Sequence, residues 1–389
     1  MVRPAIEQLP ASLIREVANA GLGRADVLPF WFGESDEVTP EPIRAAAAES
    51  LARGETFYSH NLGLPELREA LAAYTSALHR PVAASRIAVT SAGVNALMLA
   101  MQMLLGAGDE VVAVVPVWPN LTAQPLILGA TVTRVPLAPD AQGAWRLDLP
   151  ALLARVTPAT RMLLVNAPNN PTGWTLSPAE QRAILEHCRR TGTWIVADEV
   201  YERLAYDAPA GGAAPSFLDH AEPDDCLVVV HSFSKSFLMT GWRLGWLVLT
   251  EAAMPAMGRL LEFNSSCAPV FVQRGGLAAL AMAHTLVPRV VGHLRLCRDR
   301  LVTGLQALPG VQVAAAPGGL YAFFRLEGHP LAGDSLALAK HLVAAHGLGL
   351  APGAAFGPEG EGWLRWCFAS QDPARLDEGL ARLKAALVP

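Results

Sequence analysis

Short apolar runs alternate with helical patterns through the first two thirds of the chain. Continuous apolar runs at 87–90, 111–115, 161–166, 194–198, 227–231 and 245–250 predict strands. A run without polar interruption is typical of a strand that is covered on both faces of its sheet. Helical patterns at 65–78 and 96–105, and a third that starts near Pro178, lie between these strands. The alternation favours an α/β domain with a mainly parallel sheet.

The pattern changes towards the C-terminus. A long helical stretch from about residue 290 is followed by short apolar runs at 311–313 and 320–325, and a helical pattern at 372–387 closes the chain. These elements predict a smaller α+β unit, against which the N-terminal segment packs. We therefore predict a large domain of residues 40–288 and a small domain made of residues 1–39 together with residues 289–389.

Composition narrows the classes of function. The chain has 389 residues, of which 52% are hydrophobic and 17% are charged. Charged residues make up about 25% of a typical globular protein, so we expect a compact chain with a large core. The net charge is −5 and no basic block is present, which argues against binding to nucleic acid or to an anionic membrane.

The five cysteines are scattered and include no Cys-x-x-Cys pair, so neither a disulfide framework nor a metal site is expected. The first 20 residues contain no apolar run that could act as a signal peptide. No stretch approaches the roughly 20 apolar residues that a membrane-spanning helix needs. We therefore predict a reduced, cytoplasmic protein.

The segment 231–245 (HSFSKSFLMTGWRLG) carries the strongest chemical signal. Lys235 follows an apolar strand and lies between small hydroxyl residues. Burial and nearby positive charge lower the pKa of a lysine, and both suit an amine that must react in its neutral form. Arg243 lies eight residues further on and could hold a phosphate with two hydrogen bonds. A lysine at a strand end is usually a surface residue, so the argument depends on the complete segment.

The segment resembles the cofactor-attachment signature of class I and II aminotransferases, which use pyridoxal 5′-phosphate (PLP). Other landmarks of that family occur in the same order: WFGES (31–35), YSHNLG (58–63), SAGV (91–94), VPVWP (115–119), NNPTG (169–173), ADEVY (197–201), PGGLY (317–321), PGAAFG (352–357) and WLRWCFA (363–369). The resemblance implies PLP-dependent transferase fold type I, with a mainly parallel seven-stranded sheet in the large domain and a smaller α+β domain.

The resemblance also implies roles around the cofactor ring. Lys235 would hold PLP as an imine and act as the general base. Asp198 would hydrogen-bond the pyridine nitrogen and keep it protonated, which makes the ring a better electron sink. Tyr201 and Asn170 would donate to the phenolate oxygen, and Trp118 would stack on the ring. In isolation, Asp198 could equally be a helix cap, and Trp118 could be a core residue.

Further residues correspond to the phosphate and substrate ends of the family's site. The phosphate cup is expected from residues that surround a helix start or carry a hydroxyl or a guanidinium group: Ser91, Ala92, Gly93, Val94, Ser232, Ser234 and Arg243. The family often has glycine where this chain has Ala92. Tyr58 would reach the phosphate of a neighbouring subunit, which implies a homodimer with shared active sites. Arg365 would bind the substrate carboxylate, and Gly33 and Asn170 would line the substrate position.

The implied reaction moves an amino group from an L-amino acid to a 2-oxo acid by a ping-pong mechanism. Two alternatives remain open: a PLP-dependent C–S lyase or aminocyclopropane-carboxylate-synthase-like enzyme of the same fold, and a non-catalytic aminotransferase-like binding module. Family members specific for dicarboxylates place a second arginine after the lysine segment, but residues 261–272 (LEFNSSCAPVFV) contain neither arginine nor lysine. The sequence therefore favours a neutral or aromatic amino acid.

Overall fold

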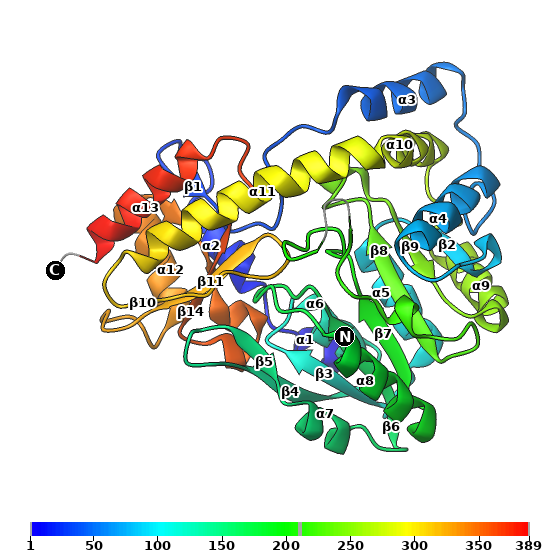
Figure 1. Cartoon of the computed structure of the whole chain (residues 1–389), viewed down its shortest axis with the longest axis horizontal. Coiled ribbons are helices and arrows are strands. Elements are labelled where there is room, and N and C mark those ends of the chain that lie inside the picture. The colour runs from blue at the N-terminus through cyan, green and yellow to red at the C-terminus, as the bar shows by residue number, and fades with distance from the viewer. Residues whose placement is uncertain (1, 209–211, 388–389) are drawn as a thin grey trace.

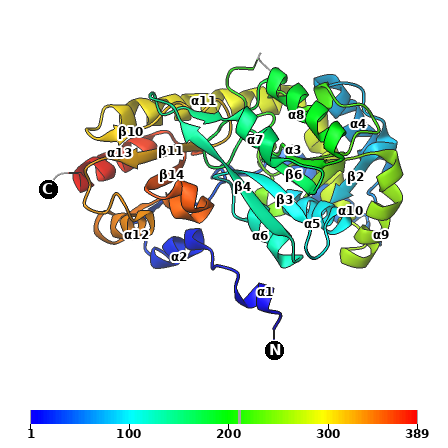
Figure 2. The same ribbon diagram turned by 90° about the horizontal axis from the view of Figure 1, so that it is seen from below.

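The computed structural model describes residues 2–208 and 212–387. A large sheet with its helices and a smaller sheet with its helices lie at opposite ends of the molecule, and one long helix connects them (Figure 1). The N-terminal helices α1 (Pro4–Glu7) and α2 (Leu13–Ala20) lie along one side of this body (Figure 2). The predicted α/β fold with a mainly parallel sheet is confirmed.

Eight strands of the described chain form the large sheet. In spatial order they are β2 (Ile87–Thr90), β9 (Gly245–Val248), β8 (Leu227–Ser232), β7 (Trp194–Asp198), β6 (Thr160–Asn166), β3 (Glu110–Val115), β4 (Thr131–Pro139) and β5 (Trp145–Leu147). β9 and β5 run antiparallel to their neighbours, and the other strands are parallel to one another.

The predicted number of seven strands was one too few. The additional strand, β5, pairs with the end of β4 across a tight turn, in which Gly143 N donates to Asp140 O at 2.9 Å. Neither β4 nor β5 forms a continuous apolar run, because their positions alternate between buried and exposed environments. Their pairing follows from the turn rather than from hydrophobicity.

Both faces of the large sheet are covered, as the apolar strands predict. Along β8, Val229 joins one core cluster while Val228 and Val230 join the other, because successive side chains of a strand point to opposite faces. One face packs α4 (Pro65–Leu78), α7 (Leu149–Arg155) and α8 (Pro178–Thr191), and the other packs α5 (Gly93–Leu104), α6 (Asn120–Ile127) and α9 (Met254–Asn264).

The smaller unit contains a four-stranded antiparallel sheet. Its strands, in spatial order, are β10 (Val311–Gln312), β11 (Tyr321–Leu326), β14 (Trp363–Cys367) and β13 (Ala351–Pro352). Helices α12 (Ser335–His346) and α13 (Ala374–Ala386) complete it, and β1 (Leu28–Pro29) joins it by pairing with β12 (Leu348–Gly349). The division into domains at residues 40 and 288 stays a prediction.

The remaining helices are α3 (Glu41–Ala52), α10 (Val270–Ala281) and α11 (Ala283–Gln306), the long helix that connects the two ends (Figure 1). Across residues 2–208 and 212–387, no single helix is long and apolar enough to cross a membrane. Helices α10 and α11 meet at a bend of 79° and pass that test only when they are taken together.

The large sheet brings polar residues together at one edge. Asn166 ends β6 opposite Asp198, which ends β7, and β8 ends beside them at Ser232. Because these three strands are parallel, their carboxyl ends lie at the same edge, where open α/β sheets bind ligands.

Candidate active site

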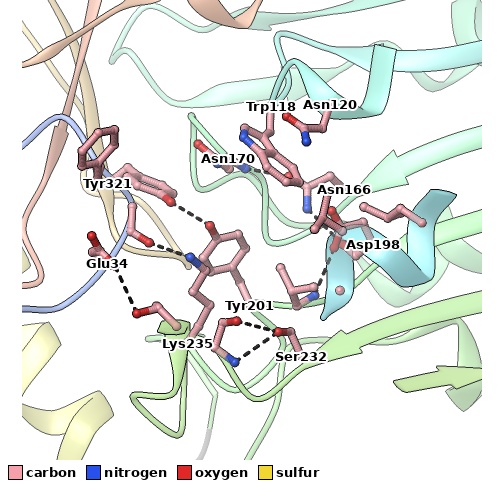
Figure 3. A pocket seen from close by; sticks show the side chains of 18 of the residues that line it. Glu34, Trp118, Asn120, Asn166, Asn170, Asp198, Tyr201, Ser232, Lys235 and Tyr321 are labelled. Atoms are coloured by element: carbon pink, nitrogen blue, oxygen red, sulfur yellow. Dashed lines mark hydrogen bonds between the residues drawn. The ribbon is translucent and has the colours of Figure 1, made fainter. Parts of the chain in front are cut away.

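A cavity of about 580 Å³ lies at this edge, between the large sheet and the smaller unit. Most of the residues predicted for the site line it: Gly33, Gly93, Val94, Trp118, Asn170, Asp198, Tyr201, Ser232, Ser234, Lys235, Arg243 and Arg365. Figure 3 shows Lys235, Asp198 and Tyr201 pointing into the same space from three different segments. Thus residues that are up to 332 positions apart, from Gly33 to Arg365, share one cavity.

Three predicted residues do not line the cavity. Ser91 and Ala92 lie in the turn between β2 and α5, directly before the residues that do line it. Tyr58 lies elsewhere on the surface and is 88% exposed. Its predicted contact with a neighbouring subunit stays a prediction.

Lys235 lies in the turn after β8 and points into the cavity. Its Nζ donates a hydrogen bond of 2.6 Å to the carbonyl oxygen of Gly33 and lies 5.7 Å from the ring centroid of Tyr201. Burial lowers the pKa of Lys235 to about 8, and the positive charge of Arg365 acts in the same direction. An appreciable fraction of this amine is therefore neutral near pH 7.

Asp198 is a buried carboxylate that lines the cavity. It ends β7, is 2% exposed, and accepts one long hydrogen bond of 3.4 Å from Val200 N. Within the described residues it forms no ion pair. Burial raises the pKa of Asp198 from its ordinary 3.8 to about 7, because the charged form loses its hydration. A cationic hydrogen-bond donor in the cavity would reverse this penalty.

Two asparagines fix the backbone beside Asp198. Asn166 Nδ2 donates to the carbonyl of Asp198 at 3.0 Å, and Asn170 N donates to Asn166 Oδ1 at 2.7 Å. The carbonyl of Asn170 accepts from Trp118 N at 2.9 Å. This chain of contacts joins the ends of β6 and β7 to the segment that carries Trp118.

The N-terminus of α5 forms the opposite end of the cavity. Ala92 precedes it with φ 97° and ψ 160°, a conformation that glycine adopts easily and that strains an alanine. This geometry is consistent with the frequent glycine at this position in the family. Gly93 and Val94 follow in the first turn, where backbone N–H groups have no partner within the helix.

Side chains from the β8–β9 connection complete this end. Ser232 Oγ donates to Ser234 Oγ at 2.9 Å, and both hydroxyls are buried against the cavity. Arg243 has a left-handed backbone conformation, with φ 55°, and donates from Nη1 to Thr240 O at 2.5 Å. Free N–H groups, two hydroxyls and a guanidinium group form a suitable environment for a phosphate.

Arg365 is a buried cation that lines the cavity from the smaller unit. It is 2% exposed and lies in β14, with its Cζ 4.3 Å from the ring centroid of Tyr321 and 4.8 Å from that of Phe356. Its Nη1 donates to Asn170 Oδ1 at 2.8 Å, and its Nε has no hydrogen-bond partner among the described residues. No carboxylate of the described residues pairs with it, so an anionic ligand would complete its environment.

Sequence reasoning assigned no role to several residues that line the cavity: Ile14, Arg15, Glu34, Leu97, Asn120, Asn166, Val200, Thr240 and Tyr321. Asn166 could have been found, because it is a polar residue at the end of an apolar strand. Tyr321 lies in a recognised landmark but contacts the site only through tertiary packing. Arg15 lies on α2, far from any motif.

Comparison with known proteins identifies the family to which this chain belongs. The family model "Aminotransferase class I and II" matches residues 26–383. A probable aspartate/prephenate aminotransferase of Aquifex aeolicus is 33% identical over 370 residues, which cover 93% of this chain and 91% of the relative. Aromatic-amino-acid aminotransferase 2 of Thermococcus litoralis is 29% identical over 388 residues, 98% of this chain and 97% of the relative.

Solved structures lead to the same family. A single mutant of Thermus thermophilus aspartate aminotransferase superposes with a TM-score of 0.91 at 28% identity, over 100% of both chains. The fold is thus that of the PLP-dependent transferases of fold type I. This chain belongs to the class I and II aminotransferases and is a PLP-dependent enzyme.

The residues of the cavity fit this cofactor. PLP requires an amine, an acidic partner for its ring nitrogen and donors for its phosphate. The cavity offers Lys235, the carboxylate of Asp198, the N–H groups at the N-terminus of α5 and the hydroxyls of Ser232 and Ser234.

Proposed function

We propose that this cavity transfers an amino group from a neutral or aromatic L-amino acid to a 2-oxo acid by a ping-pong mechanism. One observation carries the proposal. The cavity contains a buried anion, Asp198, and a buried cation, Arg365, each without a charged partner in the described chain, together with Lys235, whose pKa is about 8. A cofactor or a substrate would supply the partner that each of these groups lacks among the described residues.

Different residues of the cavity would bind the phosphate and the ring of the cofactor. Gly93 and Val94 would hold the phosphate of PLP through backbone N–H groups, with the hydroxyls of Ser232 and Ser234 and the guanidinium of Arg243. Trp118 would lie against the ring. Asp198 would accept from the ring nitrogen, and Tyr201 and Asn170 would donate to the ring oxygen.

Arg365 would bind the α-carboxylate of the substrate and so direct its Cα towards Lys235. When it is bound, PLP acts as an electron sink for the negative charge that develops at Cα. Lys235 Nζ, as a neutral amine, would accept the Cα proton and later return it. The enclosing aromatic rings of Tyr321 and Phe356 keep the Arg365 guanidinium away from water, which strengthens its attraction for a carboxylate.

A ping-pong mechanism follows from a single carboxylate site. The first 2-oxo acid must leave Arg365 before the second can bind there, so the two substrates use the cavity in turn. We propose that the active enzyme is a homodimer in which Tyr58 completes the neighbouring cavity, and the high exposure of Tyr58 supports this arrangement. We further propose a reducing, cytoplasmic location, since the cysteines are unpaired.

The preference for a neutral or aromatic substrate rests on residues 261–272, which lack a basic side chain, and on Phe32 at the mouth of the cavity. One feature favours a second candidate, a substrate with an acidic side chain. Arg15 also lines the cavity, forms no ion pair in the described chain, and lies over the ring of Phe32 at 5.7 Å. Relatives are named both for aspartate and for aromatic amino acids.

The test is to add L-amino acids one at a time to the PLP-loaded enzyme without any 2-oxo acid. A donor should change the absorption spectrum of the bound cofactor and release one equivalent of its 2-oxo acid. We expect larger second-order rate constants of this half-reaction for phenylalanine and leucine than for aspartate. Arg24, which pairs with Asp26 and does not line the cavity, provides the control. A preference for aspartate that Arg15→Ala removes and Arg24→Ala keeps would establish the second candidate. Continuous release of pyruvate and ammonia would show a lyase and contradict the proposal.

A further inference from the structure

The hydroxyl groups of two buried tyrosines meet at the cavity. Tyr201 Oη and Tyr321 Oη lie 2.7 Å apart, and their residues are 4% and 1% exposed. Tyr201 follows β7 of the large sheet, whereas Tyr321 starts β11 of the smaller sheet. Figure 3 shows this contact beside Lys235, at the junction of the two units. Both side chains line the cavity.

Each phenol has one hydrogen to donate and lone pairs to accept. In the described chain, each of these two hydroxyls has one hydrogen-bond partner, which is the other hydroxyl. One hydrogen therefore bridges the two oxygens, and the other is available to a ligand. If Tyr321 donates, the hydrogen of Tyr201 is free to point into the cavity. If Tyr201 donates, its hydrogen is used within the pair.

The surroundings make Tyr321 the better donor. The guanidinium of Arg365 lies 4.3 Å from the ring centroid of Tyr321. Burial raises the pKa of Tyr321 to about 12, and the positive charge of Arg365 opposes this increase. Burial also raises the pKa of Tyr201 well above its ordinary value of 10, and the cation that lies over its ring, Lys235 Nζ, is further away, at 5.7 Å from the centroid. The nearer cation polarises the hydroxyl of Tyr321 more strongly, so Tyr321 donates and Tyr201 accepts.

The position of Tyr321 is also sterically defined. A side-chain carbon added to Gly33 would lie only 2.0 Å from Tyr321 Oη, so the absence of a side chain at Gly33 makes room for this hydroxyl. With Arg365 on its face and Gly33 at its oxygen, the ring has little freedom. The bridging hydrogen bond is thus held in place before any ligand binds.

We propose that Tyr321 is a positioning residue that donates its hydroxyl hydrogen to Tyr201 and so directs the hydrogen of Tyr201 towards the ring oxygen of the cofactor. This inference rests on the proposed function, in which Tyr201 donates to that oxygen. Because successive hydrogen bonds polarise one another, the donation from Tyr321 strengthens the donation from Tyr201. Together they stabilise the negative charge of the ring oxygen, which lowers the pKa of the cofactor–lysine linkage.

The experiment measures that pKa by following the absorption spectrum of the resting PLP-loaded enzyme from pH 5 to pH 10, without substrate. Tyr201→Phe should raise it by about one pH unit, because a hydrogen bond to a charged acceptor is lost. Tyr321→Phe should raise it by about 0.3 pH unit, since cooperativity contributes up to about 30% per bond. The double variant should match Tyr201→Phe alone, because Tyr321 acts through Tyr201.

Tyr206→Phe is the matched control. Tyr206 is equally buried, its Oη donates to Gly319 O at 2.7 Å, and the guanidinium of Arg298 lies 4.4 Å from its ring centroid, but it does not line the cavity. This variant loses a buried hydrogen bond without touching Tyr201, so its spectral pKa should equal that of the unmodified enzyme. Thermal unfolding of both single variants reports any general loss of structure.

The outcomes separate the two proposals. An unchanged pKa in Tyr321→Phe, or a double variant in which the two shifts add, overturns the role of Tyr321 while the proposed function stands. An equal shift in Tyr206→Phe also overturns it, because the effect would then be general. An unchanged pKa in Tyr201→Phe contradicts the role of Tyr201 and removes the basis of the inference. The absence of any lysine-dependent absorption contradicts the proposed function itself.

Discussion

Residues 198–202 contribute to two polar regions of the molecule. The two regions differ in whether their buried charges form ion pairs. Asp198 and Tyr201 face the cavity. Glu199 and Glu202 lie outside it, in a buried cluster that also contains His79, Asp219 and His231. Both regions bury carboxylates at the end of the same strand. The carboxylates of the buried cluster are paired with histidines, whereas Asp198 forms no ion pair with the described residues.

The contacts of His79 show how the buried cluster is balanced. Its Nε2 lies 3.3 Å from Glu202 Oε2, and its Nδ1 lies 2.8 Å from Asp219 Oδ1. Burial acts to lower the pKa of His79, but these two carboxylates raise it to about 10. Burial acts to raise the pKa of Glu202, but His231 and His79 lower it well below its ordinary value. The ion pairs of this cluster contribute to the fold.

In the cavity, Asp198 and Arg365 are equally buried but have no charged partners among the described residues. Their complements must come from outside the chain. Partnered charges in a protein interior therefore indicate a structural role, and charges without partners indicate a binding site. Three substitutions test this distinction.

The largest effect is expected at the cavity. Lys235→Ala removes the amine and should reduce amino transfer by at least about a thousandfold, because both the nucleophile and the general base are lost. Its thermal unfolding without PLP should change little, since Lys235 forms no ion pair in the described chain. Lys340→Ala, which removes a surface lysine paired with Glu16, is the control. Full activity in Lys235→Ala would contradict the assignment of the site.

An intermediate effect is expected in the buried cluster. Glu202→Gln leaves protonated His79 without one of its two carboxylates and should lower the free energy of unfolding by about 3–5 kcal/mol. Chemical denaturation measures this change. Glu222→Gln removes a surface pair with Arg80, in which both side chains are about half exposed, and should lower it by less than about 1 kcal/mol. Equal effects of the two substitutions would mean that the cluster contributes no more than a surface pair.

A third effect has the opposite sign. Asp198→Asn should stabilise the PLP-free protein at pH 8 by up to about 4 kcal/mol, because it removes the burial of a charged carboxylate. The pKa of Asp198 is raised to about 7 in the fold from 3.8. The unmodified protein therefore loses stability between pH 4 and pH 7, and the advantage of the variant grows over the same range. A constant difference at every pH would show that Asp198 does not titrate in this way.

The sequence predicted those parts of the fold that depend on local pattern. Strands β2, β3, β6, β7, β8 and β9 are each a continuous apolar run, and each was predicted to within three residues at its ends. Strands β4 and β5 were missed, because their residues alternate between buried and exposed positions and a hairpin defines their register. The central strands of a parallel sheet that is covered on both faces are therefore easier to predict from the sequence than the strands at its edge.

The site shows the same limit. Motifs identified the lysine, the aspartate and the arginine, because each lies in a recognisable segment at a strand or a turn. They gave no role to Tyr321 or Arg15, whose relation to the cavity depends on how the smaller unit and α2 pack against the large sheet. Hydrogen bonds such as that between Tyr201 and Tyr321 join residues 120 positions apart and leave no local pattern.

The two side chains that would engage a substrate also hold the N-terminal segment. Lys235 Nζ donates to the carbonyl of Gly33, and Arg365 Nη2 donates to the carbonyl of Trp31 at 2.5 Å. A ligand that accepts a hydrogen bond from either side chain competes with these backbone oxygens. Ligand binding in the cavity and the conformational order of residues 31–33 are therefore thermodynamically linked. Hydrogen exchange of the amides in residues 31–33 should therefore report whether a ligand is bound, because the backbone of this segment is held by the same Lys235 and Arg365 nitrogen atoms that would contact the ligand.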